Sequence, residues 1–412
     1  MPLSSITPLF KGIRATPPDE IDLQHIDGKT RQALSSLSQL VALLNQNVPT
    51  TVIAVERHWD QIWPWVEALS RCVLESEGTP KSPDIEAEFT NVLDILSAIL
   101  IYPLFKHQRV EIPHALRPLL SSTPQILPLS TRLWLYASHH GYPPDIITAL
   151  SYCVGGFMIC DSCSRPNEGA PKPFLDVIGS TKYDVGEGIV KDIARHLSGP
   201  ESSYHYLVGP VIILYTAQFH PDLDCRTKCL AKGVVRWLGV MIRRLISRKS
   251  KLQWAFWFDE ITVCVGQGMH FLNGIVKNNP EGILEALDEG LIPAIVRARD
   301  YILEDGRRRH EEHETKGSPS AFFEEFLELI RRRLLFRRVM LRAVRAVRAV
   351  QKMELPQDDY LDAYGKVNRA WNKLEVEAER RSRIYKSEDR VANTYGEKIC
   401  GYEKVVVVSF PS

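Results

Sequence analysis

The chain has 412 residues, of which 44% are hydrophobic and 25% are charged. This length and composition allow a substantial buried core and exclude a disordered protein. Lysine and arginine number 51 against 50 acidic residues, so a net charge of +1 exerts no global pull toward nucleic acid or anionic lipid. Any basic binding site must therefore be local.

The first residues and the cysteines predict the compartment. The opening MPLSSITPLFKGIRATPPDE has no continuous apolar run before a small-residue cleavage site, so we expect no secretory signal. No uncharged apolar stretch reaches about 18 residues, so we expect no transmembrane segment. Eight cysteines are scattered without the rhythm of a disulfide scaffold. Together these features predict a cytoplasmic or nuclear protein.

Apolar residues recur at intervals of three and four along almost the whole chain, as in Leu34, Leu37, Leu40, Val41 and Leu44. Because alternation with period two is hard to find, this spacing predicts an all-α protein. The helices are expected near residues 29–46, 55–77, 86–104, 129–140, 143–159, 184–198, 204–218, 225–247, 253–276, 280–288, 292–304, 320–352 and 358–387.

These helices predict five segments. An irregular N-terminal segment over 1–28 precedes a helical domain over 29–304, which we expect to be an irregular α-solenoid of stacked helices, similar to armadillo and HEAT arrays. A charged linker over 305–319 leads to a basic helix and helical hairpin over 320–388. An irregular tail over 389–412 completes the chain.

A sharp turn between two helices is predicted within GILEALDEGLIPAIVRARDYI, from Gly282 to Ile302. Gly290 can adopt the left-handed conformation that a helix end needs, and Pro293 occupies an early helical position where its missing N–H costs nothing. The stretch resembles the signature of an armadillo repeat, and CLAKGVVRWLGVMIRRL echoes it around Gly233. The two glycines lie further apart than the roughly 40–47 residues of a regular array. Stacked helical pairs are expected without strict repeats.

The segment RRRLLFRRVMLRAVRAVRAVQK, from Arg331 to Lys352, carries nine basic side chains and no acid. On a helical wheel, apolar residues fill one side and basic residues fill the other, with Leu341 as the exception. This basic side is the candidate partner-binding surface. Its arginines are Arg337, Arg338, Arg342, Arg345 and Arg348.

The last predicted helix carries an apolar seam that would pack against the basic helix. If the two helices form an antiparallel pair, acids of the last helix would neutralise part of the basic side. The seam comprises Tyr360, Tyr364, Val367, Trp371, Leu374 and Ala378. Asp358, Asp359 and Asp362 would lie near Arg348 and Lys352, and Glu375, Glu377 and Glu379 would lie near residues 331–338.

Four interpretations of the basic side remain open. It could be a solvated face of an ordinary helix, which the sequence favours, or a surface for an acidic protein partner. It could also neutralise phosphates of a nucleic acid, although the nearby aromatics lie mainly on the apolar side. Membrane binding would need that apolar side exposed, which the neighbouring seam disfavours.

Two cysteine pairs raise the question of zinc. Cys160 and Cys163 form a CxxC motif, and Cys225 with Cys229 could supply the other side of a tetrahedral site. The second pair has the wrong internal spacing and is far from the first in sequence, so buried or free thiols are the preferred interpretation. We therefore expect no cofactor, with zinc as the alternative.

No catalytic motif is visible. The sequence contains neither a Walker lysine motif nor a GxSxG elbow, and its glycine pairs lack the spacing of a dinucleotide cradle. Trp59, Trp63 and Trp65 are expected to pack in the core or between helices and not to form a ligand site. We therefore expect a protein-interaction or scaffold protein that is not an enzyme, with a nucleic-acid-binding protein or a zinc protein as alternatives.

The stretch from Lys251 to Ile302 resembles the helical region that precedes a MYND-type zinc finger in a large group of proteins from mushroom-forming fungi. The stretch from Trp371 to Lys404, ending in GEKICGYEK, is similar to the lead-in to that finger. The resemblance implies an armadillo-like or otherwise helical platform used for protein contacts. Because no cysteine or histidine follows Cys400, no finger ligand carries over, and one hypothesis is a truncated or misread gene product.

Overall fold

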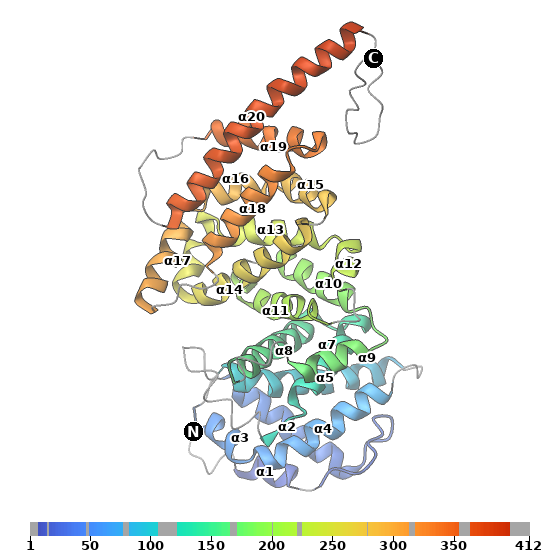
Figure 1. The fold of residues 1–412 in the computed structure, drawn as a ribbon. Coiled ribbons are helices and arrows are strands. Elements are labelled where there is room, and N and C mark those ends of the chain that lie inside the picture. The colour runs from blue at the N-terminus through green and yellow to red at the C-terminus, as the bar shows by residue number, and fades with distance from the viewer. Residues whose placement is uncertain are drawn as a thin grey trace. The chain divides into compact units, whose positions relative to one another are not determined.

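The structure is a computed structural model, and the residues that it describes form α-helices and two short 3-10 helices, with no strand among them (Figure 1). This confirms the predicted all-α stack of helices; the type of solenoid stays a prediction. The described residues are 7–14, 16–46, 49–76, 82–105, 122–164, 171–199, 201–220, 225–277, 279–312, 318–353 and 363–395.

Tertiary contacts divide the chain into two compact units. Unit 1 comprises Met1–Arg195 and Gly209–Cys225, and unit 2 comprises His196–Val208 and Arg226–Ser412. Each unit is described by itself below.

Local sequence marks where helices of unit 1 begin and end. Asp27 begins α2, since its Oδ1 accepts hydrogen bonds from the backbone N–H groups of Lys29 and Thr30 at 2.7 and 2.8 Å. Gly141, with φ of 71°, ends α7 in the left-handed conformation. The helices of unit 1 are α1 (Thr7–Ile13), α2 (Gly28–Asn45), α3 (Pro49–Arg57), α4 (Trp59–Glu75), α5 (Pro83–Phe105), α7 (Ile126–His140), α8 (Pro144–Ser164), α9 (Lys172–Ser180), most of α10 (Val185–Ser198) and most of α11 (Val208–Ala217).

Tryptophans form part of the unit 1 core, as expected. Trp65 is fully buried, and its Nε1 donates to the backbone oxygen of Ile13 at 3.0 Å, which ties α4 to α1. Trp59 is also buried and donates to Oγ1 of Thr123, while half-buried Trp63 stacks against the Trp59 ring. The buried N–H groups of Trp59 and Trp65 are therefore both satisfied.

In unit 2, residues next to a helix likewise determine where it begins. The side chain of Asn279 accepts from the backbone N–H of Glu281 at 3.0 Å, and Pro280 occupies the first position of α15. Within α14, Trp257 leaves helical geometry, and its ring stacks on His205 at 4.0 Å. The elements of unit 2 are η2 (Glu201–Leu207), most of α12 (Cys225–Ala231), α13 (Val234–Leu245), η3 (Arg248–Ser250), α14 (Lys251–Val276), α15 (Pro280–Asp288), α16 (Leu291–Arg297), α17 (Arg299–Glu312), α18 (Pro319–Arg333), α19 (Arg337–Gln351) and α20 (Ala363–Tyr395).

The glycine turn predicted at Gly290 is confirmed, and a second one occurs at Gly233, inside the stretch expected to form one helix over 225–247. Gly290 separates α15 from α16 with φ of 72°, and Gly233 separates α12 from α13 with φ of 75°. Both lie in the left-handed region that glycine occupies without steric cost. Local sequence alone therefore specifies these two reversals.

Replacing Gly290 by alanine should lower the free energy of unfolding by about 1–2 kcal/mol, because an alanine must adopt a left-handed backbone there. An added Cβ would come no closer than 4.0 Å to the side chain of Arg243, so the loss isolates backbone strain. Gly290→Asn is the control, since asparagine tolerates this conformation better. Urea denaturation measures both variants; an alanine variant as stable as the parent would contradict the expectation.

Several predicted helix boundaries are wrong. Residues 164–180, which none of the expected helices covers, include α9, whose Phe174, Val177 and Ile178 are buried at helical spacing. The helix α1 lies within the segment expected to be irregular, and Phe10 and Ile13 anchor it in the core. The expected helices 55–77, 204–218, 225–247 and 292–304 are each divided in two.

The largest correction concerns the predicted helix 320–352, which breaks over Leu334–Phe336 into α18 and α19. No glycine or proline marks this break. It follows from packing: both helices lie against α20, but α18 also lies against α14 whereas α19 also lies against α15 and α16. Helix α17 also continues to Glu312, inside the predicted linker, and residues 313–317 lie outside the described part.

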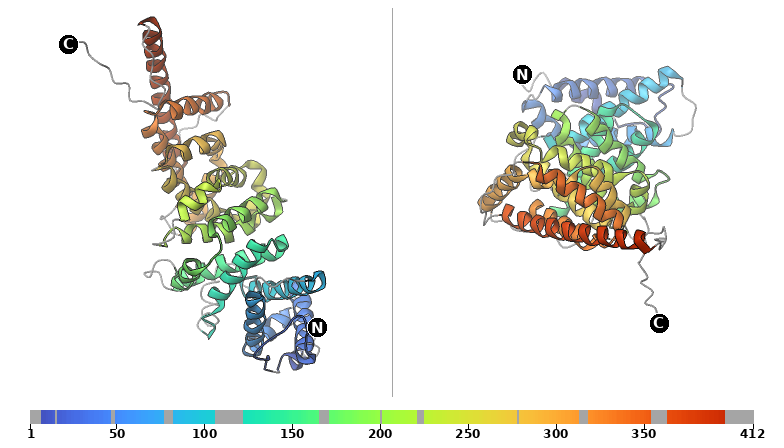
Figure 2. Two further views of the ribbon diagram at one scale, coloured as in Figure 1. Left: turned by 90° about the vertical axis from the view of Figure 1, so that its right-hand side faces the viewer. Right: turned by 90° about the horizontal axis from the view of Figure 1, so that it is seen from above.

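The predicted apolar seam of the last helix is buried. Val367, Trp371 and Leu374 are inaccessible or nearly so, and α20 packs against both α18 and α19 (Figure 2). At its N-terminal end, the hydroxyl of Tyr364 donates to the backbone oxygen of Val296 at 2.9 Å, which fixes α20 to α16. Tyr360 lies outside the described residues.

Candidate functional site

Helix α19 holds the candidate arginines on a rigid support. Its apolar side packs against α15, α16, α18 and α20. Because the chain breaks before Arg337, Arg331 belongs to α18 and is not part of the same helical face. The buried residues of α19 are Val339, Met340, Ala343, Val344, Ala346, Val347 and Val350.

Two of the candidate arginines form ion pairs with acidic residues of α15. Arg338 Nη1 lies 2.9 Å from Glu281 Oε1, and Arg342 Nε lies 2.5 Å from Asp288 Oδ1. The hydrogen bond to Asp288 raises the pKa of Arg342. Since these pairs are largely exposed, each stabilises the protein by only about 0–1 kcal/mol.

The prediction that acids of the last helix neutralise the basic side is only partly right. Glu375 and Glu379 accept hydrogen bonds from Gln351 Nε2 at 2.9 and 2.8 Å, not from an arginine of α19. Glu377 pairs with Arg381 on its own helix at 2.6 Å. The pKa of Arg331 is raised first by its hydrogen bond to Glu328 and less by Glu377. Asp358, Asp359 and Asp362 lie outside the described residues.

A line of exposed side chains remains along α19. Arg338, Leu341, Arg345, Arg348 and Lys352 follow one another at alternating intervals of three and four residues, so they share one face of the helix and its C-terminal end. We call these five residues the basic strip. Arg345, Arg348 and Lys352 form no ion pair with any residue that the structure describes.

Leu341 lies between Arg338 and Arg345, near the N-terminal end of the basic strip, with 46% of its surface exposed. The helical wheel marks it as an exception, but the wheel alone does not separate an exposed leucine from one covered by a neighbouring element. Arg337 is exposed at the start of the same helix, one turn before Leu341. The strip therefore offers both positive charge and one apolar contact.

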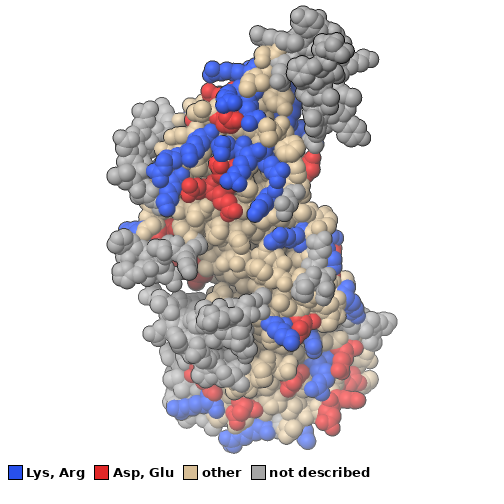
Figure 3. All heavy atoms as spheres, viewed as in Figure 1, with Lys and Arg blue, Asp and Glu red and all other residues tan. Residues whose placement is uncertain are grey.

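Charges of both signs surround this region of unit 2. In Figure 3, Lys and Arg side chains gather over the part of unit 2 that holds α18 and α20, with Asp and Glu side chains among them. On the α13 side, Glu289 lies 3.6 Å from Arg236 Nε and 4.0 Å from Arg243 Nη2. The carboxylates at and just after α15 thus compensate arginines of two helices, while the strip on α19 keeps cations without such partners among the described residues.

The described residues show no arrangement of side chains that would support the zinc alternative. Cys225 and Cys229 are both buried in α12, whereas the side chains of Cys160 and Cys163 lie outside the described ones. Across the described residues, no group of three or more His, Cys, Asp and Glu side chains is placed to hold a metal ion. Zinc binding through these cysteines stays a prediction.

No protein-family model matches the chain, and a search of curated proteins likewise finds no significant match. None of the described helices is long and apolar enough to cross a membrane.

Proposed function

We propose that this chain is a non-catalytic protein-interaction protein and that the basic strip of α19 binds an acidic protein partner. The observation that carries the proposal is the group Arg345, Arg348 and Lys352, which forms no ion pair with any described residue. It continues the line of the exposed Leu341 along the same face of α19. Because α19 is packed on its apolar side, binding would not require the helix to rearrange.

The strip favours a particular partner chemistry. Carboxylates would accept charge-assisted hydrogen bonds from the guanidinium groups, and an apolar side chain between them would cover Leu341. A nucleic acid would use the cations but leave Leu341 uncovered, so an acidic segment with an apolar residue at its centre fits better. The resemblance to helical platforms of MYND-type proteins also supports protein contacts.

The cellular compartment of the protein is also part of this proposal. Cys153 and Cys264 are fully buried thiols that form no disulfide with any described residue. Burial raises the pKa of both thiols and keeps them protonated. Thiols in this state fit a reducing environment, so we place the protein in the cytoplasm or nucleus.

The double variant Arg345→Glu/Arg348→Glu should weaken binding of an acidic peptide by at least about tenfold, because attraction becomes repulsion at two positions. The probe is a fluorescent glutamate-rich peptide with one central leucine, and the measurement is anisotropy at fixed salt. Leu341→Ala should lower the affinity for the same peptide by about fivefold, because the variant loses an apolar contact.

The matched control is Arg369→Glu, an exposed arginine of α20 outside the basic strip, which should leave the affinity unchanged. Random-sequence duplex DNA is the competing probe. If the duplex binds more tightly than the peptide and ignores Leu341→Ala, the nucleic-acid interpretation replaces this one. Peptide binding that survives the double charge reversal would refute the proposal.

A further inference from the structure

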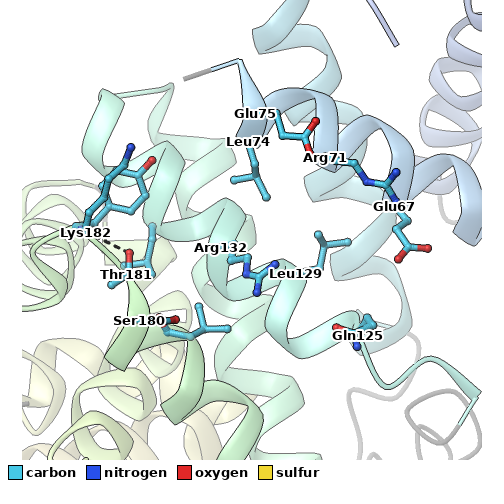
Figure 4. A pocket seen from close by; sticks show the side chains of 13 residues that line it. Glu67, Arg71, Leu74, Glu75, Gln125, Leu129, Arg132, Ser180, Thr181 and Lys182 are labelled. Carbon is cyan, nitrogen blue, oxygen red and sulfur yellow. Dashed lines mark hydrogen bonds between the residues drawn. The ribbon is translucent and has the colours of Figure 1, made fainter. Parts of the chain in front are cut away.

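Unit 1 contains a hollow of about 480 Å³ that none of the sequence motifs indicates (Figure 4). One wall is a face of α4 that carries Glu67, Arg71 and Leu74 at intervals of four and three residues. A second wall is a face of α7 that carries Leu129 and Arg132. The two helices pack against each other, so the hollow has a rigid base.

The third wall is the segment after α9, which packs on α7. Thr181 Oγ1 accepts a hydrogen bond from the backbone N–H of Tyr183 at 3.2 Å, which leaves its hydroxyl proton available to donate. The Tyr183 ring lies 4.8 Å from the ring of His139 on α7. This contact holds the wall in place and gives it an aromatic surface.

Two arginines of the hollow lack a charge partner in the part of the chain that the structure describes. Arg71 and Arg132 form no ion pair with any described residue, although Glu67 and Glu75 lie one turn away from Arg71 on either side. Figure 4 shows Arg132 in the middle of the lining side chains. With Lys182, the lining carries three cations against two carboxylates. The hollow therefore has an excess of positive charge and donors available for an anion.

Apolar side chains lie beside these donors. Leu74 and Leu129 line the hollow, together with the buried Leu135 and Val177. A ligand with both a charged and an apolar end would satisfy both parts of the lining. The volume falls within the roughly 300–1,000 Å³ of small-molecule sites.

We propose that this hollow binds a small organic carboxylate with an apolar body. The carboxylate accepts hydrogen bonds from Arg132 and the Thr181 hydroxyl, with Arg71 adding positive charge. The apolar body lies against Leu74 and Leu129. This site lies in unit 1 and does not depend on the basic strip of unit 2.

Phenylacetate is the test ligand, measured by ligand-observed NMR titration on the full chain. Phenylacetamide has the same shape without the charge and should bind at least about tenfold more weakly. Inorganic phosphate has charge without the apolar body and should also bind more weakly. The variant Arg132→Gln should lower the affinity for phenylacetate by about tenfold, because it removes a charge-assisted hydrogen-bond donor.

Arg31→Gln is the matched control, since Arg31 is an exposed arginine of α2 in the same unit and does not line the hollow. Its affinity for phenylacetate should equal that of the parent. Equal binding of phenylacetate and phenylacetamide, or an unchanged affinity in Arg132→Gln with the parent's unfolding temperature, would overturn the proposal. Absence of phenylacetate binding at millimolar concentration would overturn it as well.

Discussion

Gly209→Ala is expected to lower the free energy of unfolding by about 3 kcal/mol, because helices α8 and α11 cross with their backbones in contact. A Cβ at Gly209 would lie 2.6 Å from the carbonyl carbon and oxygen of Ser151, and 2.8 Å from the backbone nitrogen of Tyr152. Backbone atoms of a packed helix cannot move aside as a flexible side chain can. The two helices must separate, which loosens the packing around them.

Gly188→Ala is the control for this prediction. Its Cβ would lie 3.7 Å from the Trp134 ring, an ordinary contact, so alanine should be neutral or stabilise α10 by up to about 1 kcal/mol. Urea denaturation followed by circular dichroism compares the two variants. Similar losses at Gly209 and Gly188 would show that the close crossing is absent.

The reciprocal position provides a second check. A Cβ at Gly155 would lie 2.8 Å from the Cα of Gly209, so Gly155→Ala should destabilise the same crossing. Once one methyl group has separated the helices, the second should cost less. The double variant Gly155→Ala/Gly209→Ala should therefore lose clearly less stability than the two single losses combined.

Trp65→Ala is expected to lower the free energy of unfolding by about 3–5 kcal/mol, because it removes a fully buried indole from the unit 1 core. It also removes the hydrogen bond from Nε1 to the Ile13 oxygen that joins α4 to α1. Trp65→Phe keeps most of the volume and loses the donor, so it should cost about 1–3 kcal/mol. Denaturant titration measures the free energy of unfolding of both variants and so separates the loss of volume from the loss of the hydrogen bond.

Trp63→Ala on the same helix serves as the comparison. Trp63 is only half-buried and makes a ring contact with Trp59 at 5.9 Å between centroids, so its loss should be smaller. Equal destabilisation by Trp63→Ala and Trp65→Ala would contradict the placement of Trp65 at the centre of the core.

The two binding proposals depend on different consequences of helix packing. The basic strip keeps cations available because the acids of α15 reach Arg338 and Arg342 but form no ion pair with Arg345 or Arg348. The hollow in unit 1 keeps Arg71 and Arg132 available because it lies between two helix faces and a third wall. Each proposal can therefore fail without affecting the other.

The sequence by itself determined the helical nature of the chain and its sharpest turns. Apolar spacing of three and four residues predicts where helices form, since this signal lies within a few turns of one helix. The left-handed conformation of Gly290 is equally local, as is the burial pattern of Val367, Trp371 and Leu374. All of these features depend on neighbours in sequence.

Tertiary structure alone decided where helices break without glycine or proline and which charges meet. The break over Leu334–Phe336 arises because α18 packs on α14 and α19 packs on α15 and α16, beside the helix α20 that both contact. The partner of Arg342 is Asp288 and not an acid of α20, and the hollow around Arg132 needs the unexpected helix α9 nearby. The physical reason is range: helix propensity is set within about one turn, whereas ion pairs and cavities join segments that only packing brings together.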